Sequence, residues 1–287
     1  MLAVFKKELL TYFTTSVGYI FMGVFLLISG ILFTMGNIFG MDSDYATFLG
    51  GLIMIFLLVV PLLTMKIYSE EKRQKTDQLL MTAPQSTAGI VAGKFLAAVA
   101  LFFMTLLITG LYPLFLSFHT RMDTAQIMGT YIGFFLLGIS FISIGVYISS
   151  LTDSQAGAAI LTFCVLIITW IVDFIGGFMP VSPLAGVIFA LIITAMTAGW
   201  MYNATKNIPA AAIPVIIGVI IIAALYFINQ DLFINLIAKT LSWFSLTKRF
   251  TDFPMGILKL NAVIYYLSFS GFFLFLTSQR IEKQRWS

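Results

Sequence analysis

The densest group of chemically active side chains lies in residues 68–94, which read YSEEKRQKTDQLLMTAPQSTAGIVAGK. Six charged residues fall within eight consecutive positions: Glu70, Glu71, Lys72, Arg73, Lys75 and Asp77. The segment ends in Gly93-Lys94, a pair that is found in phosphate-binding loops. Such a loop needs the spacing G-x-x-x-x-G-K-[ST] between a strand and a helix. Here Gly89 and Gly93 are one residue too close and Phe95 replaces the Ser or Thr, so we do not expect this motif to bind ATP.

The other candidates for chemistry are single residues. Cys164 is the only cysteine, so no intramolecular disulfide can form, and no Cys/His cluster offers a metal site. The one histidine, His119, stands beside Arg121 in an expected loop, and we interpret it as a loop or interfacial residue. Asp173 is the one acidic residue deep in an apolar run, and intramembrane carboxylates are often functional. It is either a pathway or gating residue, or a residue that reaches the outer interface.

The composition places most of this chain in a membrane. Sixty per cent of the 287 residues are hydrophobic and ten per cent are charged, and the mean hydropathy is +1.02. Soluble domains have about a quarter charged residues, and each helical crossing of a bilayer takes roughly 20 apolar residues. We expect an all-α polytopic membrane protein, with one transmembrane domain over residues 1–287 and no nucleic-acid partner.

The apolar runs predict about eight transmembrane helices, at residues 16–39, 48–67, 92–117, 127–150, 156–178, 184–202, 210–228 and 261–278. Residues 1–15 have apolar side chains at helical spacing with Lys6 and Lys7 between them, which is typical of an amphipathic helix in the membrane interface. Residues 229–260 mix aromatic and basic residues, which suits helices on the outer interface.

Basic residues predict the orientation. Eight crossings put both termini on one side, and cytoplasmic segments are enriched in Lys and Arg. If the N-terminus is cytoplasmic, eleven basic residues lie inside: Lys6, Lys7, Lys66, Lys72, Arg73, Lys75, Lys94, Lys206, Arg280, Lys283 and Arg285. Five then lie outside: Arg121, Lys239, Lys248, Arg249 and Lys259. Both termini and residues 68–91 are therefore predicted to be cytoplasmic.

Most runs of charged residues are solvated loops. Residues 68–91 have a more specific pattern, which a solvated loop does not need. Thr76 can cap a short helix, with Asp77 near the positive end of its dipole. The large apolar residues 79–81 then form a surface that a partner would bury. Lys94 is expected to mark the cytoplasmic end of the next span, with its ammonium group among the lipid headgroups.

The same segment resembles the cytoplasmic segment of type-2 ABC exporter permeases. That segment commonly has Ser-Glu-Glu-Lys/Arg, then Gly-Thr-x-Glu-Leu-Leu, then Pro and a Gly-Lys at the next span. The matching residues are Ser69, Glu70, Glu71, Lys72, Thr76, Leu79, Leu80, Pro84, Gly93 and Lys94. Lys75 stands where the family often has Gly, and Gln78 where it often has Glu. Three features are similar to the gliding-motility-type branch of the family: the Thr-Asp-Gln-Leu-Leu version of the motif, the SSLTDSQ turn and residues 250–277.

This resemblance implies a half-transporter in the bacterial plasma membrane, often with a core of six spans. Two permease subunits, identical or different, would pair, and each would sit on one of two ATPase subunits that hold ATP and Mg²⁺. No cofactor would bind this chain directly, and an accessory membrane protein is possible. The resemblance assigns a coupling helix, lodged in the ATPase, to Glu70, Glu71, Thr76, Asp77, Gln78, Leu79, Leu80 and Met81.

Three other functions stay open at this point. A secondary transporter or channel should have paired intramembrane charges or matching broken spans in two halves. A polytopic membrane enzyme should have a constellation of His, Asp, Glu or Ser near an interface. A membrane anchor for a soluble complex would need only the docking helix, and the sequence does not separate it from a permease subunit.

Overall fold

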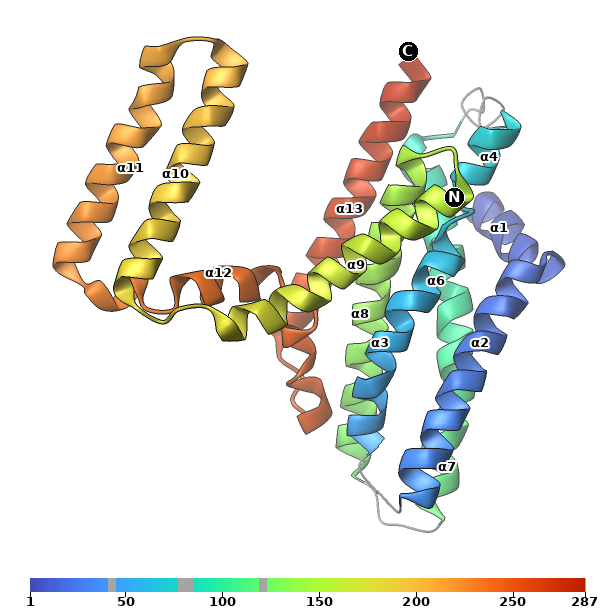
Figure 1. The fold of residues 1–287 in the computed structure, drawn as a ribbon. Helices are drawn as coiled ribbons and strands as arrows, with labels where there is room; N and C mark the ends of the chain where they lie inside the picture. The colour runs from blue at the N-terminus through green and yellow to red at the C-terminus, as the bar shows by residue number, and fades with distance from the viewer. Residues whose placement is uncertain (41–44, 77–84, 119–122, 287) are drawn as a thin grey trace. The chain divides into compact units, whose positions relative to one another are not determined.

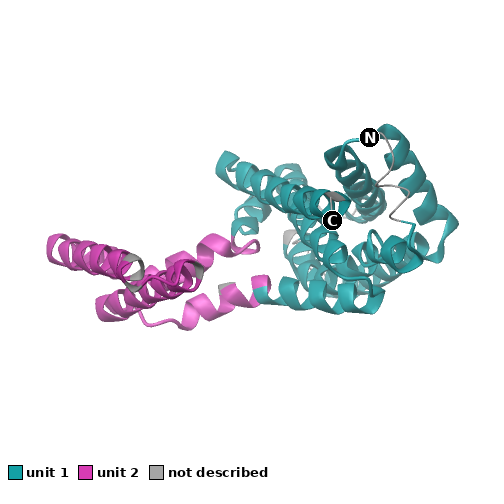
Figure 2. Cartoon of the chain, turned by 90° about the horizontal axis from the view of Figure 1, so that it is seen from above, with its two compact units in different colours: residues 1–168, 249–287 teal, residues 169–248 magenta. Residues whose placement is uncertain are grey.

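The computed structural model of the chain describes residues 1–40, 45–76, 85–118 and 123–286 (Figure 1). Every regular element in these ranges is helical, as the composition predicts. The chain divides into two compact units (Figure 2): unit 1 comprises residues 1–168 and 249–287, and unit 2 comprises residues 169–248.

Unit 1 contains most of the helices. They are α1 (Leu2–Thr14), α2 (Ser16–Phe33), the π-helical η1 (Thr34–Phe39), α3 (Tyr45–Thr64), α4 (Ser69–Gln74), α6 (Thr87–Thr109), α7 (Leu111–Ser117), α8 (Thr124–Leu151), the first part of α9 (Gln155–Phe178), η3 (Lys248–Phe250), η4 (Phe253–Met255) and α13 (Leu260–Trp286). Side-chain caps fix several starts: the Ser86 hydroxyl accepts from the Gly89 N–H at α6, and the Asp123 carboxylate accepts from the Ala125 N–H at α8.

Unit 2 contains the rest of α9, α10 (Pro183–Thr205), α11 (Ile208–Ile228), η2 (Gln230–Phe233) and α12 (Leu236–Phe244). The α10 and α11 helices pack closely because Gly218 has no side chain: a Cβ there would lie 2.5 Å from the Thr194 Cγ2. On α12, Trp243 and Phe244 are exposed aromatic residues within the expected interfacial segment 229–260.

The predicted spans correspond to helices. Seven helices in the described ranges are long and apolar enough to cross a membrane: Ser16–Phe39, Thr47–Gln74, Thr87–Ser117, Thr124–Leu151, Gln155–Phe178, Pro183–Asn203 and Leu260–Arg285. At the eighth predicted span, α11 provides the shorter apolar stretch Ala212–Ile228. The chain is a multi-pass membrane protein.

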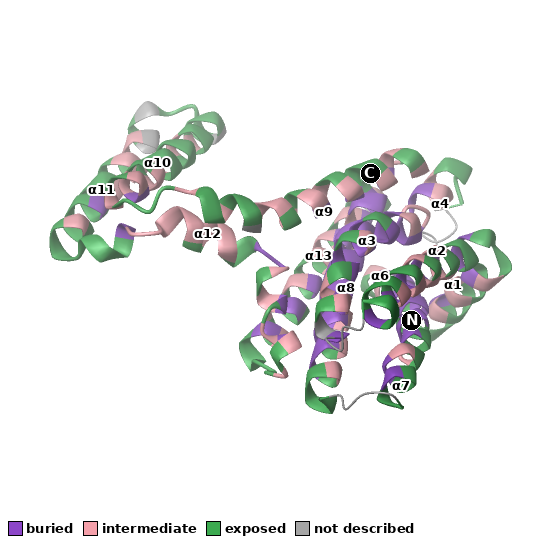
Figure 3. Ribbon diagram, turned by 60° about the horizontal axis from the view of Figure 1, so that its bottom comes forward, coloured by how far each residue is buried: buried purple, intermediate pink, exposed green. Residues whose placement is uncertain are grey.

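Aromatic rings fill the interior of unit 1. Phe56, Phe102, Phe134 and Phe141 are fully buried, and the rings of Phe56 and Phe102 lie 4.7 Å apart between centroids. Buried residues, purple in Figure 3, gather along α3 and α8. The central helix is α8, which packs against α3, α6 and α13. Its Gly138 permits this packing, because a Cβ there would lie 2.3 Å from the Phe102 Cε1. The core of unit 1 is therefore solid protein.

Both ends of the chain lie at the same end of unit 1 as α4, while α7 lies at the opposite end (Figure 1). Contacts fix this arrangement: α1 packs along α6, and the Ser278 hydroxyl on α13 donates to the Thr87 hydroxyl at the start of α6. The two termini and α4 thus lie at the same end of unit 1.

Candidate functional site

The charged segment begins as a sharp corner after α3. The turn at 65–68 leads into the short helix α4, which ends at Lys75. The Thr76 N–H and hydroxyl both donate to the Glu71 carbonyl, at 2.9 and 3.4 Å. Of the predicted coupling residues, Glu70, Glu71 and Thr76 are described, whereas Asp77, Gln78, Leu79, Leu80 and Met81 lie outside the described residues.

Lys75 has an unusual backbone conformation for a residue with a side chain. It ends α4 in the left-handed conformation, with φ 56° and ψ 23°. Residues with a Cβ adopt this conformation at a cost of roughly 1–2 kcal/mol, and glycine adopts it freely. Glycine is therefore the residue that the backbone favours at this position.

Lys94 is the centre of the corner, and the prediction that it reaches the lipid headgroups is wrong. Its side chain is 1% exposed and turns inward. The ammonium Nζ lies 2.8 Å from the Glu71 Oε1 and 3.2 Å from the Glu8 Oε1, and it donates to the Ile67 carbonyl at 2.8 Å. It also lies 5.0 Å from the centre of the Tyr68 ring. A buried charge must be paired. The two carboxylates and the carbonyl stabilise the ammonium group more than lipid headgroups would, so Lys94 turns inward.

The carboxylates in turn hold a second lysine. The Nζ of Lys7 lies 3.5 Å from the Glu8 Oε1 and 3.6 Å from the Glu71 Oε1, but this side chain is 61% exposed. Two acids and two bases therefore form a charge-balanced cluster, and we call Lys7, Glu8, Glu71 and Lys94 the corner cluster. It joins three segments that are far apart in sequence: α1, α4 and α6.

The corner cluster and its neighbours satisfy the open carbonyls at the end of α3. The last carbonyls of a helix lack partners within it and form the negative end of its dipole. Here the buried Tyr12 hydroxyl donates to the Leu63 carbonyl at 3.3 Å, and the Lys94 ammonium reaches the Ile67 carbonyl just beyond. Burial, and secondarily the nearby Glu8 charge, raises the pKa of Tyr12 above its usual range, so this phenol stays a donor. Side chains from α1 and α6 thus fix the direction in which α3 ends.

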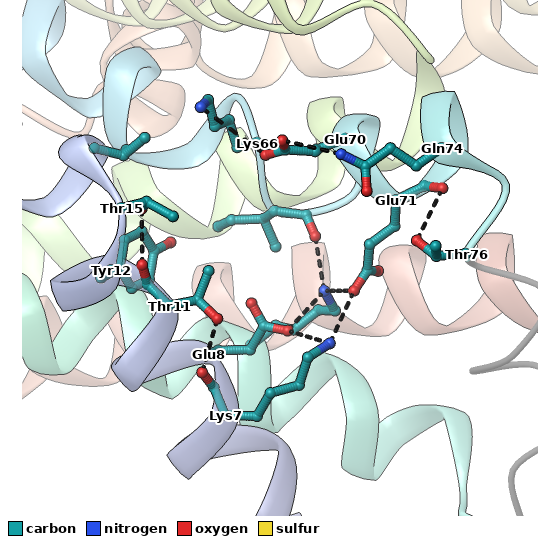
Figure 4. A pocket seen from close by; sticks show the side chains of 13 residues that line it. Lys7, Glu8, Thr11, Tyr12, Thr15, Lys66, Glu70, Glu71, Gln74 and Thr76 are labelled. Atoms are coloured by element: carbon teal, nitrogen blue, oxygen red, sulfur yellow. Dashed lines mark hydrogen bonds and ion pairs between the residues drawn. The ribbon is translucent and has the colours of Figure 1, made fainter.

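A cavity of about 380 Å³ opens beside this cluster (Figure 4). It lies between α1 and the corner, and its lining includes Lys7, Glu8, Lys66, Glu70 and Glu71. The Lys66 and Glu70 side chains form an ion pair at 4.0 Å along one wall. Acidic and basic groups are balanced around the cavity, so it does not select a highly charged ligand of either sign.

The other side of the corner is attached to the end of α8. The Ser149 hydroxyl accepts from the backbone N–H of Tyr68 at 3.1 Å. The Lys72 ammonium donates to the Ser150 carbonyl and lies 3.9 Å from the Asp153 carboxylate in the turn before α9. A displacement of α4 would therefore act on α1, α6 and α8 together.

A close approach of α1 to α6 makes this geometry possible. A Cβ on Gly93 would lie 2.9 Å from the Val4 Cβ and 3.0 Å from the Met1 carbonyl oxygen, so the glycine allows the two helices to meet. Glu8 was not among the predicted site residues. The signal that points to it is its position on the same face of α1 as Val4 and Tyr12, the two buried residues of that helix.

The remaining predicted residues are not brought to this cluster. Asp173 lies on the part of α9 that belongs to unit 2, and the structure does not describe its side chain. His119 lies outside the described residues. Cys164 is exposed on α9. Within the described ranges, no group of three His, Cys, Asp or Glu side chains could hold a metal ion.

The chain is similar to a known family of membrane proteins. Residues 24–181, more than half of the chain, match the family model described as ABC-2 family transporter protein. No curated protein matches the chain. The matched range begins within α2 and includes the corner at α4, all of α6 and α8, and α9.

Proposed function

Since this chain belongs to the ABC-2 family of transporter membrane proteins, we propose that it is the permease subunit of an exporter powered by a separate ATPase subunit. The observation that carries the proposal is the corner at residues 65–76. It is tied by side chains to α1, α6 and α8, and it leads directly into the segment with Leu79, Leu80 and Met81. A force applied there would reach several membrane helices at once.

The coupling step follows from this attachment. The segment at residues 77–81 would lodge in a cleft of the ATPase, with its apolar residues buried by the partner. ATP-driven closure of two ATPase subunits would then displace α4. Because Lys94 and Lys72 connect α4 to α6 and to the end of α8, these helices would move with it. Such coupling requires contacts that differ between the two states.

The transport path would run between two permease subunits rather than through one. The interior of unit 1 is filled by fully buried phenylalanine rings, which leave no polar route for a substrate. By contrast, α2 and α9 have large exposed apolar residues, such as Leu27 and Ile160, that a second subunit can cover. Pairing of two permease subunits, identical or different, supplies that surface.

Charge supports a cytoplasmic position for the corner. The end of unit 1 that has α4 and both termini also carries Lys6, Lys7, Arg280, Lys283 and Arg285. Basic residues near span ends favour the cytoplasmic side. We therefore place both termini and the coupling segment in the cytoplasm of a bacterial cell, with export as the direction of transport.

The test is the ATPase activity of the complex that this chain forms with a candidate ABC ATPase subunit from the same genome. We expect the ATPase to co-purify with the wild-type chain and its turnover to depend on the permease. The double variant Leu79→Asp, Leu80→Asp should lose both properties, because two buried carboxylates would have no partner. Lys283→Asp, which changes an exposed charge on α13 at the same end of unit 1, should keep both.

Two results would overturn the proposal. One is an ATPase that neither binds nor responds to this chain. The other is binding without any effect of the permease on ATP turnover, which would make the chain a membrane anchor.

A further inference from the structure

An apolar groove lies at the end of unit 1 that is far from the corner. It has a volume of about 420 Å³ and is formed by α6, α7 and α8. Its lining includes Phe103, Leu107, Gly110, Tyr131, Ile132 and Phe135. Neither the corner cluster nor the proposed coupling step uses this groove.

A kink in one membrane span produces the groove. The α6 helix ends at Thr109 and α7 begins at Leu111, within the single apolar stretch Thr87–Ser117. Pro113 has no N–H to donate to the Thr109 carbonyl four residues earlier, and its ring disfavours a straight helix. The Tyr45 hydroxyl from α3 donates to that carbonyl instead, at 3.4 Å. The kink is thus stabilised by a neighbouring helix, as backbone inside a membrane requires.

The lining offers an occupant no hydrogen bond. Among the described residues that line the groove, the one polar side chain is Tyr131, and its hydroxyl is held by hydroxyl groups of α3 and α6. It lies 2.7 Å from the Tyr45 hydroxyl and 3.3 Å from the Thr109 hydroxyl. A polar group in the groove would lose its hydrogen bonds and gain none. The occupant must therefore be a hydrocarbon.

We propose that the groove binds one acyl chain of a bilayer phospholipid. It lies within two candidate spans, Thr87–Ser117 and Thr124–Leu151, so lipid hydrocarbon surrounds it. Its volume of about 420 Å³ is within the range of roughly 300–1,000 Å³ for ligand pockets. That is also well above the ~150 Å³ that holds a benzene ring, so it fits a long flexible chain better than one side chain of a second subunit. This inference rests on the membrane assignment and not on the proposed transport function.

The test uses phospholipid with a photoreactive diazirine in its acyl chain, incorporated into nanodiscs with the full-length chain. After irradiation, mass spectrometry locates the adducts. We expect enrichment on Phe103, Leu107 and Ile132 relative to the exposed residues of α2. Leu107→Trp should fill the groove and lower these adducts to the level of α2.

The matched control is Leu114→Trp, which adds the same ring to the same span outside the groove. Leu107 and Leu114 are similarly exposed, at 60% and 56%. Ile132→Trp provides a second way to fill the groove from α8 if the α6 variant is not monodisperse. Adducts spread evenly over α2, α6 and α9 would refute a specific lipid site.

A second result would also overturn the proposal. Leu107→Cys in a Cys164→Ser background should form no disulfide-linked dimer under mild oxidation, whether or not two copies of the chain pair through other helices. Efficient formation of a disulfide-linked dimer through position 107 would show that another copy of the chain covers the groove.

Discussion

Removal of the Lys94 charge should destabilise the corner strongly, because Lys94→Met leaves two carboxylates without their buried partner. Methionine has a similar length and packs adaptably, so the change isolates the charge from the volume. Loss of one member of a buried ion pair costs about 3–5 kcal/mol. The Glu8 and Glu71 side chains are 14% and 15% exposed, and Lys7 remains beside them. Partial exposure and the nearby Lys7 charge both favour a loss of stability at the lower end of this range, about 3 kcal/mol.

The Ile67 carbonyl adds to this loss. Lys94 is its donor at 2.8 Å, and an unsatisfied buried acceptor costs about 1–3 kcal/mol. We take about 1 kcal/mol, because the neighbouring cavity can admit water to this end of α3. The expected total is therefore about 4 kcal/mol, which corresponds to a factor of roughly 1,000 in the folded-to-unfolded ratio.

The assay is reversible unfolding of the purified chain in mixed micelles, and steric trapping measures the free energy of unfolding. Lys94→Met should lower the free energy of unfolding by about 4 kcal/mol. The triple variant Lys94→Met, Glu8→Gln, Glu71→Gln should recover about 3 kcal/mol, because no buried carboxylate is left unpaired and Lys7, at 61% exposed, is solvated. Lys6→Met, an exposed change on α1, should stay within about 0.5 kcal/mol of the wild type. The reasoning fails if the triple variant is no more stable than Lys94→Met, or if Lys94→Met equals Lys6→Met.

Three smaller changes test other parts of the corner. Tyr68→Phe should leave the free energy of unfolding unchanged or slightly raised, since the buried Tyr68 hydroxyl has no hydrogen-bond partner among the described residues; a loss above about 1 kcal/mol would contradict this. Lys75→Gly should raise the free energy of unfolding by up to about 1 kcal/mol in the same assay, because the backbone of this residue is left-handed. A lower free energy of unfolding would contradict the left-handed conformation at this position. Gly93→Val should force α1 away from α6, because the added side chain would collide with Val4, and should expose α1 to proteolysis. Gly23→Val should not, because no atom lies within 4 Å of its added Cβ; equal proteolysis of the two variants would refute the close packing.

The membrane spans were predictable because apolar length alone sets them. A crossing needs a long run of hydrocarbon side chains, and local caps such as Ser86 and Asp123 then fix where helices start. The N-terminal amphipathic helix was predictable for the same reason, since the spacing of its apolar residues is local. The division of the chain at Thr169 and Lys248 was not predictable, because it depends on which helices pack together.

The corner cluster could not be predicted from local pattern. Lys94 follows Glu8 by 86 residues, and the two meet only because α1 lies along α6 at Gly93. A lysine near the start of a span is usually expected to reach the headgroups, and nothing local distinguishes this one. The same holds for Lys72, whose partners at the end of α8 are 78 residues away. Local sequence patterns do not show which charges pair over such separations, because this depends on how the helices pack.

The proposed coupling requires that residues 77–81 touch the ATPase subunit. The most direct measurement places a photo-crosslinking cysteine reagent at position 79 or 80, in a Cys164→Ser background, within the assembled complex. We expect a covalent adduct to the ATPase subunit at both positions, with a yield that changes when ATP is trapped on the ATPase. An ATPase that co-purifies with the chain but forms no adduct at either position would contradict it.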